Sequence, residues 1–293
     1  MARIAFIGLG NMGGGMAANL AKAGHDVRAF DLSEEALARA KDAGCLPADS
    51  AAAAAEDAEA VVTMLPAGRH VAQVYESGLL EAVDRAAILI DCSTIEVSVA
   101  RQLADMAAAK GLMAVDAPVS GGIAAAAAGT LTFMVGGADE AYRQAEPFLS
   151  DMGAKVIHAG PAGAGQAAKI CNNMLLGATM IATAEAFALA ERLELNPQTF
   201  FDISSVSSGQ SWSMTSYCPM PGVGPETPAD HDYRGGFAAA LMLKDLKLAQ
   251  AAATGAGVDT PMGARAEELY RAFVDGGQGE LDFSAIIRTS RSA

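Results

Sequence analysis

A short apolar run leads directly into a glycine-rich turn in Ile4-Ala5-Phe6-Ile7-Gly8-Leu9-Gly10-Asn11-Met12-Gly13. The run predicts a buried strand, and the Ala-rich residues 12–23 predict a helix behind it. GxGxxG between a strand and a helix is typical of a turn that holds a dinucleotide pyrophosphate. In such a turn Gly8 makes the bend, Gly10 lets the backbone approach the phosphates, and Gly13 lets helix and strand pack closely. Asn11 and Met12 complete the predicted cofactor turn. A turn that serves only packing can have the same sequence pattern.

Asp31 distinguishes these two interpretations, because it ends the second strand-like run at the interval expected for an acid that binds an adenosine ribose. Capping of the next helix is the alternative role. A carboxylate here would repel a 2′-phosphate, so the sequence favours NAD over NADP. Two later strand ends, at Met64-Leu65 and at Thr94, fall where loops at the carboxyl edge of a sheet cover a cofactor, or where they serve as ordinary loops.

Strand-like runs and helical stretches alternate as far as His158, which predicts a parallel sheet covered by helices. The expected strands are Arg3–Gly8, Asp26–Asp31, Ala60–Leu65, Ile88–Cys92, Met113–Asp116, Thr130–Val135 and Lys155–His158. From about Gln166 to Leu193 the chain predicts one long helix, and the remainder is nearly all helical. We therefore expect an α/β protein with a Rossmann-type doubly wound parallel sheet in residues 1–162. An all-α substrate and dimerisation domain, residues 163–293, begins with the long interdomain helix.

The composition of the 293-residue chain is 52% hydrophobic, and its formal net charge is −14. Such a chain is not of the disordered class, and without a basic patch it is not expected to bind nucleic acid. Scattered cysteines and isolated histidines predict reduced thiols and no metal site. The nearest membrane-length run is interrupted by Glu185, so we expect no membrane partner and a soluble protein of the cytoplasm or of an organelle matrix, with the cytoplasm favoured. The Ala- and Met-rich helical half predicts a homodimer or homotetramer.

A second polar turn follows the expected strand Met113–Asp116, where Ser120, Gly121 and Gly122 offer a hydroxyl and exposed N–H groups to a small carboxylate. A plain turn has the same composition. At the start of the long helix, Lys169 and Asn173 are four residues apart and so share one face. A lysine there is either a surface residue or a catalytic base, and spacing alone leaves both open.

Chemistry favours the catalytic base once a nicotinamide is expected nearby. Oxidation of an alcohol needs a group that takes the hydroxyl proton as the hydride leaves the carbon. A lysine performs this role when its pKa is lowered, and desolvation and a positive nicotinamide ring both act in that direction.

Four motifs in the same order resemble those of the β-hydroxyacid dehydrogenases: Gly8–Gly13, Asp116–Gly122, Gly163–Asn173, and Gly236-Phe237 with Leu243–Leu246. The resemblance implies that Lys169 is the catalytic acid/base and that Asn173 orients the substrate. It implies that the substrate carboxylate is held by Ser120, Gly121 and Gly122.

The same resemblance implies that Thr94, Met64 and Leu65 contact the cofactor, that Lys244 closes over it, and that Trp212 walls the substrate pocket. From the residues alone, Lys244 is indistinguishable from a solvated helix charge, and Trp212 is equally suited to filling a core.

The implied reaction is the NAD-dependent oxidation of 3-hydroxyisobutyrate to methylmalonate semialdehyde in valine catabolism. A related 3-hydroxyacid dehydrogenase, or a reductase of glyoxylate, succinic semialdehyde or tartronate semialdehyde, would share the whole site. A non-catalytic cofactor-binding scaffold is the alternative of another class. An imine reductase fits less well, because Lys169 stands where such relatives typically have another residue.

Overall fold

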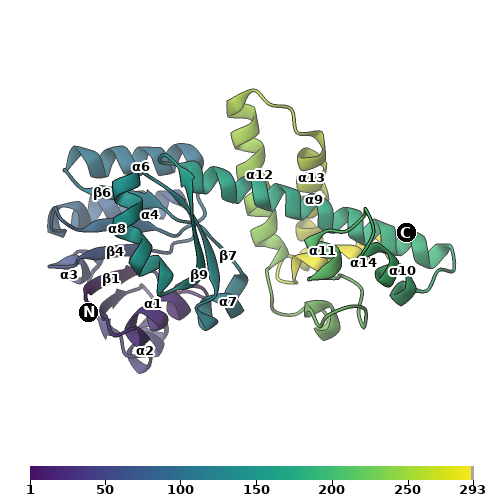
Figure 1. The fold of residues 1–293 in the computed structure, drawn as a ribbon, viewed down its shortest axis with the longest axis horizontal. Helices are drawn as coiled ribbons and strands as arrows, with labels where there is room; N and C mark the ends of the chain where they lie inside the picture. Colours follow the sequence, from purple (N-terminus) through teal and green to yellow (C-terminus); the bar gives the residue numbers. More distant parts are fainter. Residues whose placement is uncertain (292–293) are drawn as a thin grey trace. The chain divides into compact units, whose positions relative to one another are not determined.

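The computed structural model describes residues 1–291, which form two compact units. The first extends from Met1 to Lys169, and the second starts at Ile170. One long helix, α9 (Ala164–Arg192), runs through the division between them (Figure 1). The last two residues of the expected helical domain, 292 and 293, lie outside the described residues.

The first unit is built on a nine-stranded sheet in the order β3-β2-β1-β4-β5-β6-β8-β7, with β9 paired to β8. Its strands are β1 (Arg3–Ile7), β2 (Asp26–Phe30), β3 (Leu46–Pro47), β4 (Ala60–Thr63), β5 (Ile88–Asp91), β6 (Met113–Asp116), β7 (Val119–Ser120), β8 (Leu131–Gly136) and β9 (Gly153–Gly160). The first six strands are parallel and reverse their order between β1 and β4, so the doubly wound Rossmann-type sheet is confirmed.

Beyond β6 the sheet is mixed, which departs from the expectation of a parallel sheet throughout. Strand β8 runs antiparallel to both β6 and β7, and β9 runs parallel to β8. The connection between β7 and β8, residues 121–130, is shorter than the roughly dozen residues that a parallel crossover needs. The chain therefore turns back on itself between β7 and β8. The short strands β3 and β7 were not among the strands predicted from the sequence.

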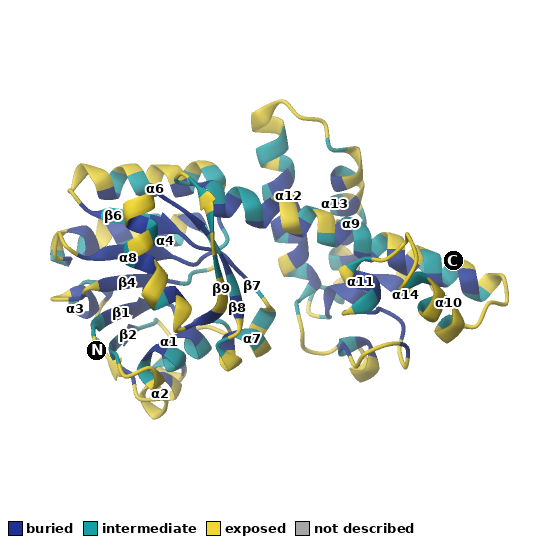
Figure 2. Cartoon of the chain, in the orientation of Figure 1, coloured by how far each residue is buried: buried dark blue, intermediate teal, exposed yellow. Residues whose placement is uncertain are grey.

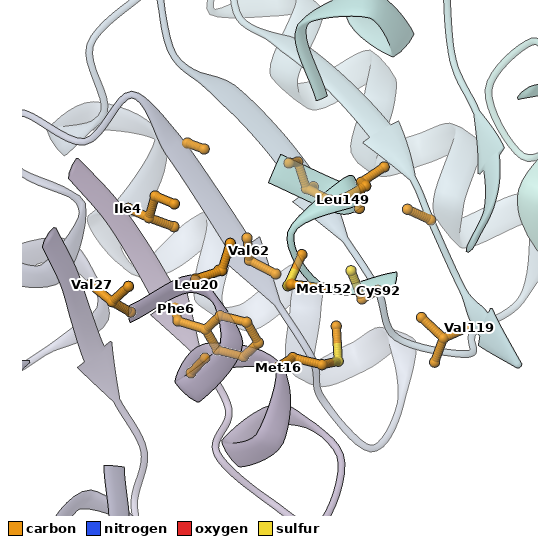
Figure 3. Packing of buried hydrophobic residues seen from close by; sticks show 14 of the residues in the cluster. Ile4, Phe6, Met16, Leu20, Val27, Val62, Cys92, Val119, Leu149 and Met152 are labelled. Atoms are coloured by element: carbon orange, nitrogen blue, oxygen red, sulfur yellow. The ribbon is translucent and has the colours of Figure 1, made fainter. Parts of the chain in front are cut away.

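Helices cover both faces of this sheet. They are α1 (Gly13–Lys22), α2 (Glu34–Asp42), α3 (Ala51–Ala55), α4 (Gly68–Val74), α5 (Leu80–Ala82), α6 (Val97–Ala109), α7 (Gly122–Ala128) and α8 (Asp139–Ser150), with a kinked segment, Tyr75–Leu79, between α4 and α5. Along β1, Phe6 packs into the core under α1 and α8, while its neighbour Ile7 joins the core on the opposite face (Figure 3). Most strand residues are consequently buried, as Figure 2 shows.

The second unit is helical. After α9 come α10 (Pro197–Ser204), α11 (Trp212–Thr215), α12 (Ala239–Ala256), α13 (Pro261–Phe273) and α14 (Ile287–Arg291), with shorter helical turns at Pro228–His231, Val274–Gln278 and Phe283–Ile286. Its core contains Phe187, Tyr270 and Phe283, all fully buried. Pro197 begins α10, because proline fits the first helical position, and the Asn196 side chain caps that helix.

Helix α9 is long and apolar enough, by length and composition alone, to cross a membrane. Its apolar run is interrupted by Glu185, as expected from the sequence. Within the second unit, however, α9 contributes Met180, Ala184 and Phe187 to the buried core. Its apolar character is therefore explained by packing against other helices of that unit.

Candidate cofactor and substrate site

The turn between β1 and α1 forms the wall of a pocket of about 360 Å³. Gly8 directly follows β1 and has a φ of +97°, which favours glycine. A Cβ on Gly13 would overlap the carbonyl oxygen of Gly8, whereas a Cβ on Gly10 would meet no atom within 4 Å. The pocket is lined by Leu9, Gly10, Asn11, Gly14, Gly15, Ala36, Arg39 and Ala40.

These features fit a dinucleotide. The bare backbone at exposed Gly10 lies open at the start of α1, where the first-turn N–H groups and the helix dipole favour a phosphate. Met12 stands at the N-cap of α1 without a capping side chain, and Asn11 is exposed beside it. Of the predicted cofactor turn, Gly10 and Asn11 therefore line the pocket, and the buried Gly8 and Gly13 let the turn pack closely behind them.

Asp31 lies directly after β2 and faces the same turn. Its carboxylate accepts a hydrogen bond of 2.6 Å from the Leu9 N–H and one of 2.8 Å from the Ser33 N–H. The capping of α2 is done by Ser33 instead, whose hydroxyl accepts a hydrogen bond from the Ala36 N–H. Asp31 is partly buried, and its hydrogen bond to Leu9, which lines the pocket, places it next to the pocket wall.

The two further cofactor loops leave the neighbouring strands β4 and β5. The carbonyl oxygen of Met64 and the side chain of Leu65 pack against Gly8. A Cβ on residue 8 would overlap the Met64 carbonyl oxygen and would lie 2.8 Å from the Leu65 side chain. Leu65 is tied to the next loop, because its N–H donates to the Ser93 hydroxyl at 2.9 Å. Thr94 follows Ser93 and is half-buried. The structure thus brings Met64, Leu65 and Thr94 to the carboxyl edge of the sheet.

Ser120 ends β7, and Gly121 and Gly122 follow it into α7. Gly121 has a φ of +135°, and a Cβ there would lie 2.6 Å from the Cβ of Ala125. Only glycine therefore allows this turn to close so tightly. Ser120 is paired with Thr132 of β8, in the last strand of the sheet order, and is half-buried.

Lys169 is 8% exposed and lies on the first turns of α9. This burial removes the interpretation of Lys169 as a surface lysine. The start of its helix is fixed by Asp116, whose carboxylate accepts hydrogen bonds from the Gly163 N–H at 2.7 Å and the Gln166 N–H at 2.8 Å. Burial raises the pKa of Asp116, and these backbone hydrogen bonds oppose that effect.

Sequence reasoning did not single out Asp116 for this role. A signal existed: Asp116 ends a strand-like run within the motif that also contains Ser120, and acids that end buried strands commonly accept hydrogen bonds from helix N-termini. Its partners lie about fifty residues further along the chain, so their identity required the fold.

The second unit contains the remaining predicted residues. Asn173 is 2% exposed, and its amide donates a hydrogen bond of 2.5 Å to Asp245. Lys244, next to that acid on α12, is half-buried rather than fully solvated. Trp212 is 50% exposed and stacks on Tyr217 at 4.8 Å between ring centroids. It is therefore not core filler.

Comparison with known proteins extends over the whole chain. Residues 3–160 match the family model of the NAD binding domain of 6-phosphogluconate dehydrogenase, and residues 163–290 match that described as NAD-binding of NADP-dependent 3-hydroxyisobutyrate dehydrogenase. The chain is 50% identical to 3-hydroxyisobutyrate dehydrogenase of Pseudomonas aeruginosa, with 99% of each chain covered. It is 48% identical to an NAD-dependent L-serine dehydrogenase of the same organism, with 98% of this chain and 97% of that one covered.

A solved structure gives the same result. A 3-hydroxyisobutyrate dehydrogenase of Mycobacterium tuberculosis, described with L-serine, superposes with a TM-score of 0.96 at 47% identity and covers 99% of both chains. Fold and site together define an NAD-binding oxidoreductase. The chain belongs to the β-hydroxyacid dehydrogenase family, as its four sequence motifs predicted. NAD is its cofactor.

Proposed function

We propose that this protein oxidises the hydroxyl of 3-hydroxyisobutyrate to give methylmalonate semialdehyde, with Lys169 as the general acid/base. The observation that carries the proposal is a buried lysine near the start of α9, with Asn173 four residues further along the same helix. NAD, when bound, supplies the nicotinamide that accepts the hydride from the carbinol carbon. Lys169, as the neutral amine, takes the hydroxyl proton at Nζ while the carbonyl forms, and returns it in the reverse direction.

The other site residues have distinct proposed roles. The Ser120 hydroxyl and the N–H groups of Gly121 and Gly122 bind the substrate carboxylate, which the tight glycine turn supports. Asn173, whose amide is oriented by Asp245, positions the substrate hydroxyl. Trp212 supplies an apolar wall for the substrate, which its half-exposed stacked ring supports.

Cofactor contacts are proposed for four strand-end loops and for one residue of α12. The glycine turn Gly8–Gly13 holds the pyrophosphate, and Asp31 binds the adenosine ribose and disfavours a 2′-phosphate. Met64, Leu65 and Thr94 cover the cofactor, and Lys244 closes over it. We expect Asp31→Asn to raise the kcat/KM ratio of NADP to NAD, because the neutral amide removes the repulsion of the 2′-phosphate.

A second candidate substrate is L-serine, which is favoured by the 48% identical L-serine dehydrogenase and by the M. tuberculosis structure described with L-serine. Both molecules are 3-hydroxy acids. Serine has an ammonium group where 3-hydroxyisobutyrate has a methyl group, so a site for serine needs a hydrogen-bond acceptor there and a site for 3-hydroxyisobutyrate needs an apolar wall.

The test is a kinetic panel with NAD and NADP on 3-hydroxyisobutyrate and L-serine, and in reverse on glyoxylate, succinic semialdehyde and tartronate semialdehyde. The proposal expects the highest kcat/KM with 3-hydroxyisobutyrate and NAD. In the same assay Lys169→Ala should lower kcat by about 10²–10⁴-fold, the usual contribution of general acid–base catalysis. Lys247→Ala, which removes an exposed lysine of α12, is the matched control. Near-wild-type turnover by folded Lys169→Ala would refute the mechanism.

Domain roles and assembly are also proposed. Residues 1–162 serve as the NAD-binding domain, and residues 163–293 serve as the substrate and dimerisation domain of a cytoplasmic homodimer or homotetramer. In support, α9 exposes Leu175 and Leu189, which are 14 residues apart and so lie on one stripe of the helix, and Leu193, directly after the helix, is exposed as well. A monomeric mass by light scattering at micromolar concentration would contradict self-association.

A further inference from the structure

Three buried polar side chains of the first unit have no role in the chemistry proposed above. Asp91 is 3% exposed, and Ser93 and Gln166 are fully buried. They come from the end of β5, the loop that follows it, and the start of α9. A continuous series of hydrogen bonds nevertheless joins them, which we call the Asp91–Ser93–Gln166 network.

On its cofactor side the network holds two strand-end loops together. The Ser93 hydroxyl donates to Asp91 Oδ1 at 2.6 Å and accepts from the Leu65 N–H at 2.9 Å. The same Asp91 oxygen accepts from the Thr63 hydroxyl at 2.7 Å. The end of β4, which carries the Met64-Leu65 turn, is therefore fixed relative to the loop that carries Thr94.

On its other side the network holds helix α9. Gln166 Nε2 donates to the Ser93 carbonyl oxygen at 2.7 Å, and Gln166 Oε1 accepts from the Ile95 N–H at 3.0 Å. Both ends of one amide are thus bound to the same loop, on either side of Thr94. An amide bound at both ends fixes the rotation of the helix as well as its distance from the loop.

Lys169 lies three residues after Gln166, which is less than one helical turn. A displacement of Gln166 therefore carries Lys169 with it. Loops 64–65 and 93–95 are the same loops that cover the cofactor in the proposed function. One amide side chain thus connects the loops expected to hold the nicotinamide with the helix that carries the acid/base.

We propose that Gln166, supported by Ser93 and Asp91, is a positioning residue that sets the place of Lys169 relative to the cofactor loops. The inference rests on the proposed role of Lys169. It assigns to Gln166 and Ser93 no direct contact with the reacting atoms. Since reacting groups must be placed to within about 1 Å, loss of the amide should lower kcat by about 10²-fold while NAD binding changes little.

The test compares Gln166→Met, which keeps the length of the side chain but removes both polar atoms, with Gln198→Met on exposed helix α10 as the matched control. We expect Gln166→Met to lower kcat about 10²-fold, to leave KM for NAD within about threefold, and to raise the deuterium isotope effect of a substrate labelled at the carbinol carbon. Ser93→Ala, which leaves the Leu65 N–H unpaired, should instead raise KM for NAD. The control should match wild type in all three.

The substrate in these assays is whichever 3-hydroxy acid of the panel the wild type oxidises fastest, so a wrong substrate choice does not affect the outcome. Hydrogen exchange at the Ile95 amide gives a readout without substrate and should accelerate in Gln166→Met. If that amide exchanges faster while kcat and the isotope effect stay at wild-type values, the positioning role is refuted. Loss of activity with an unchanged isotope effect indicates damage to the fold and also refutes it.

Gln166→Glu covers the case in which the methionine variant does not fold. A protonated glutamic acid keeps the acceptor for the Ile95 N–H and donates to the Ser93 carbonyl oxygen, whereas the carboxylate repels that oxygen. Its kcat relative to wild type should therefore fall as the pH rises. A pH-independent ratio would contradict the proposal.

Discussion

Replacing Asp91 with asparagine is expected to remove a pH-dependent loss of stability from the first unit. Burial raises the pKa of this carboxyl to about 6, and the nearby charge of Asp116 adds to the effect, while hydrogen bonds from Ser93 and Thr63 oppose it. Tyr75 and Cys92 are the other titratable groups that interact with this acid. Asp91 Oδ2 has no hydrogen-bond partner within residues 1–291. Hydrogen bonds therefore offset only part of the free-energy cost of burying the ionised Asp91 carboxylate.

The magnitude follows from linkage between protonation and folding. The pKa rises from 3.8 to about 6, so ionisation of Asp91 costs the folded state about 3 kcal/mol at 1.36 kcal/mol per tenfold change in acidity. Between pH of about 4 and 6 the folded protein keeps a proton that the unfolded chain has lost. The free energy of unfolding therefore falls as the pH rises through this window, and the loss is complete above it.

Asparagine does not titrate, so the difference in unfolding free energy between Asp91→Asn and wild type should grow with pH. The protein has a pI near 4.6, and a range from about pH 5 to 8 avoids precipitation there; over that range the expected growth is about 1.4 kcal/mol. The unpaired asparagine N–H lowers the free energy of unfolding by the same amount at every pH. The prediction therefore concerns how the difference between the two proteins changes with pH, and not its absolute size.

The assay is urea unfolding followed by circular dichroism at several pH values in both proteins. Leu149→Ala, which removes a fully buried apolar side chain from the same unit, is the control, because its difference from wild type should not change with pH. A difference between Asp91→Asn and wild type that is flat, or that shrinks as the pH rises, would refute the reasoning.

Three further predictions concern packing. Gly13→Ala places a methyl group on the Gly8 carbonyl oxygen and 3.2 Å from the Phe6 ring, so NADH binding measured by fluorescence should weaken more than about tenfold; an unchanged Kd would contradict this. Phe187→Ala removes a fully buried ring from the second unit and should lower its unfolding free energy by about 3–5 kcal/mol, measured by tryptophan fluorescence; a loss under about 1 kcal/mol would show loose packing. Asp282→Ala leaves the Phe237 and Ser284 N–H groups unpaired and should lower the free energy of unfolding by about 3 kcal/mol or more. The measurement is thermal melting, and an unchanged Tm would exclude a structural role for Asp282.

Most of the first unit could be predicted because its signals are local. Hydrophobic runs predicted the main strands to within a few residues. The glycine turn and Asp31 predicted the cofactor, which the comparisons confirm as NAD. The antiparallel return of β8 was not predicted, because strand direction depends on the connection and pairing partners rather than on the strand's own residues.

By itself, the sequence determined the fold class, the family and the set of residues that carry the expected chemistry, since these depend on short motifs and their order. Only the tertiary structure decided that Lys169 is buried rather than a surface cation, because burial depends on what other segments cover. Only the structure brought Gln166 against Ser93 and Ile95, some seventy residues away along the chain. A buried amide finds its partners across the fold, and no local pattern in the sequence records such a contact.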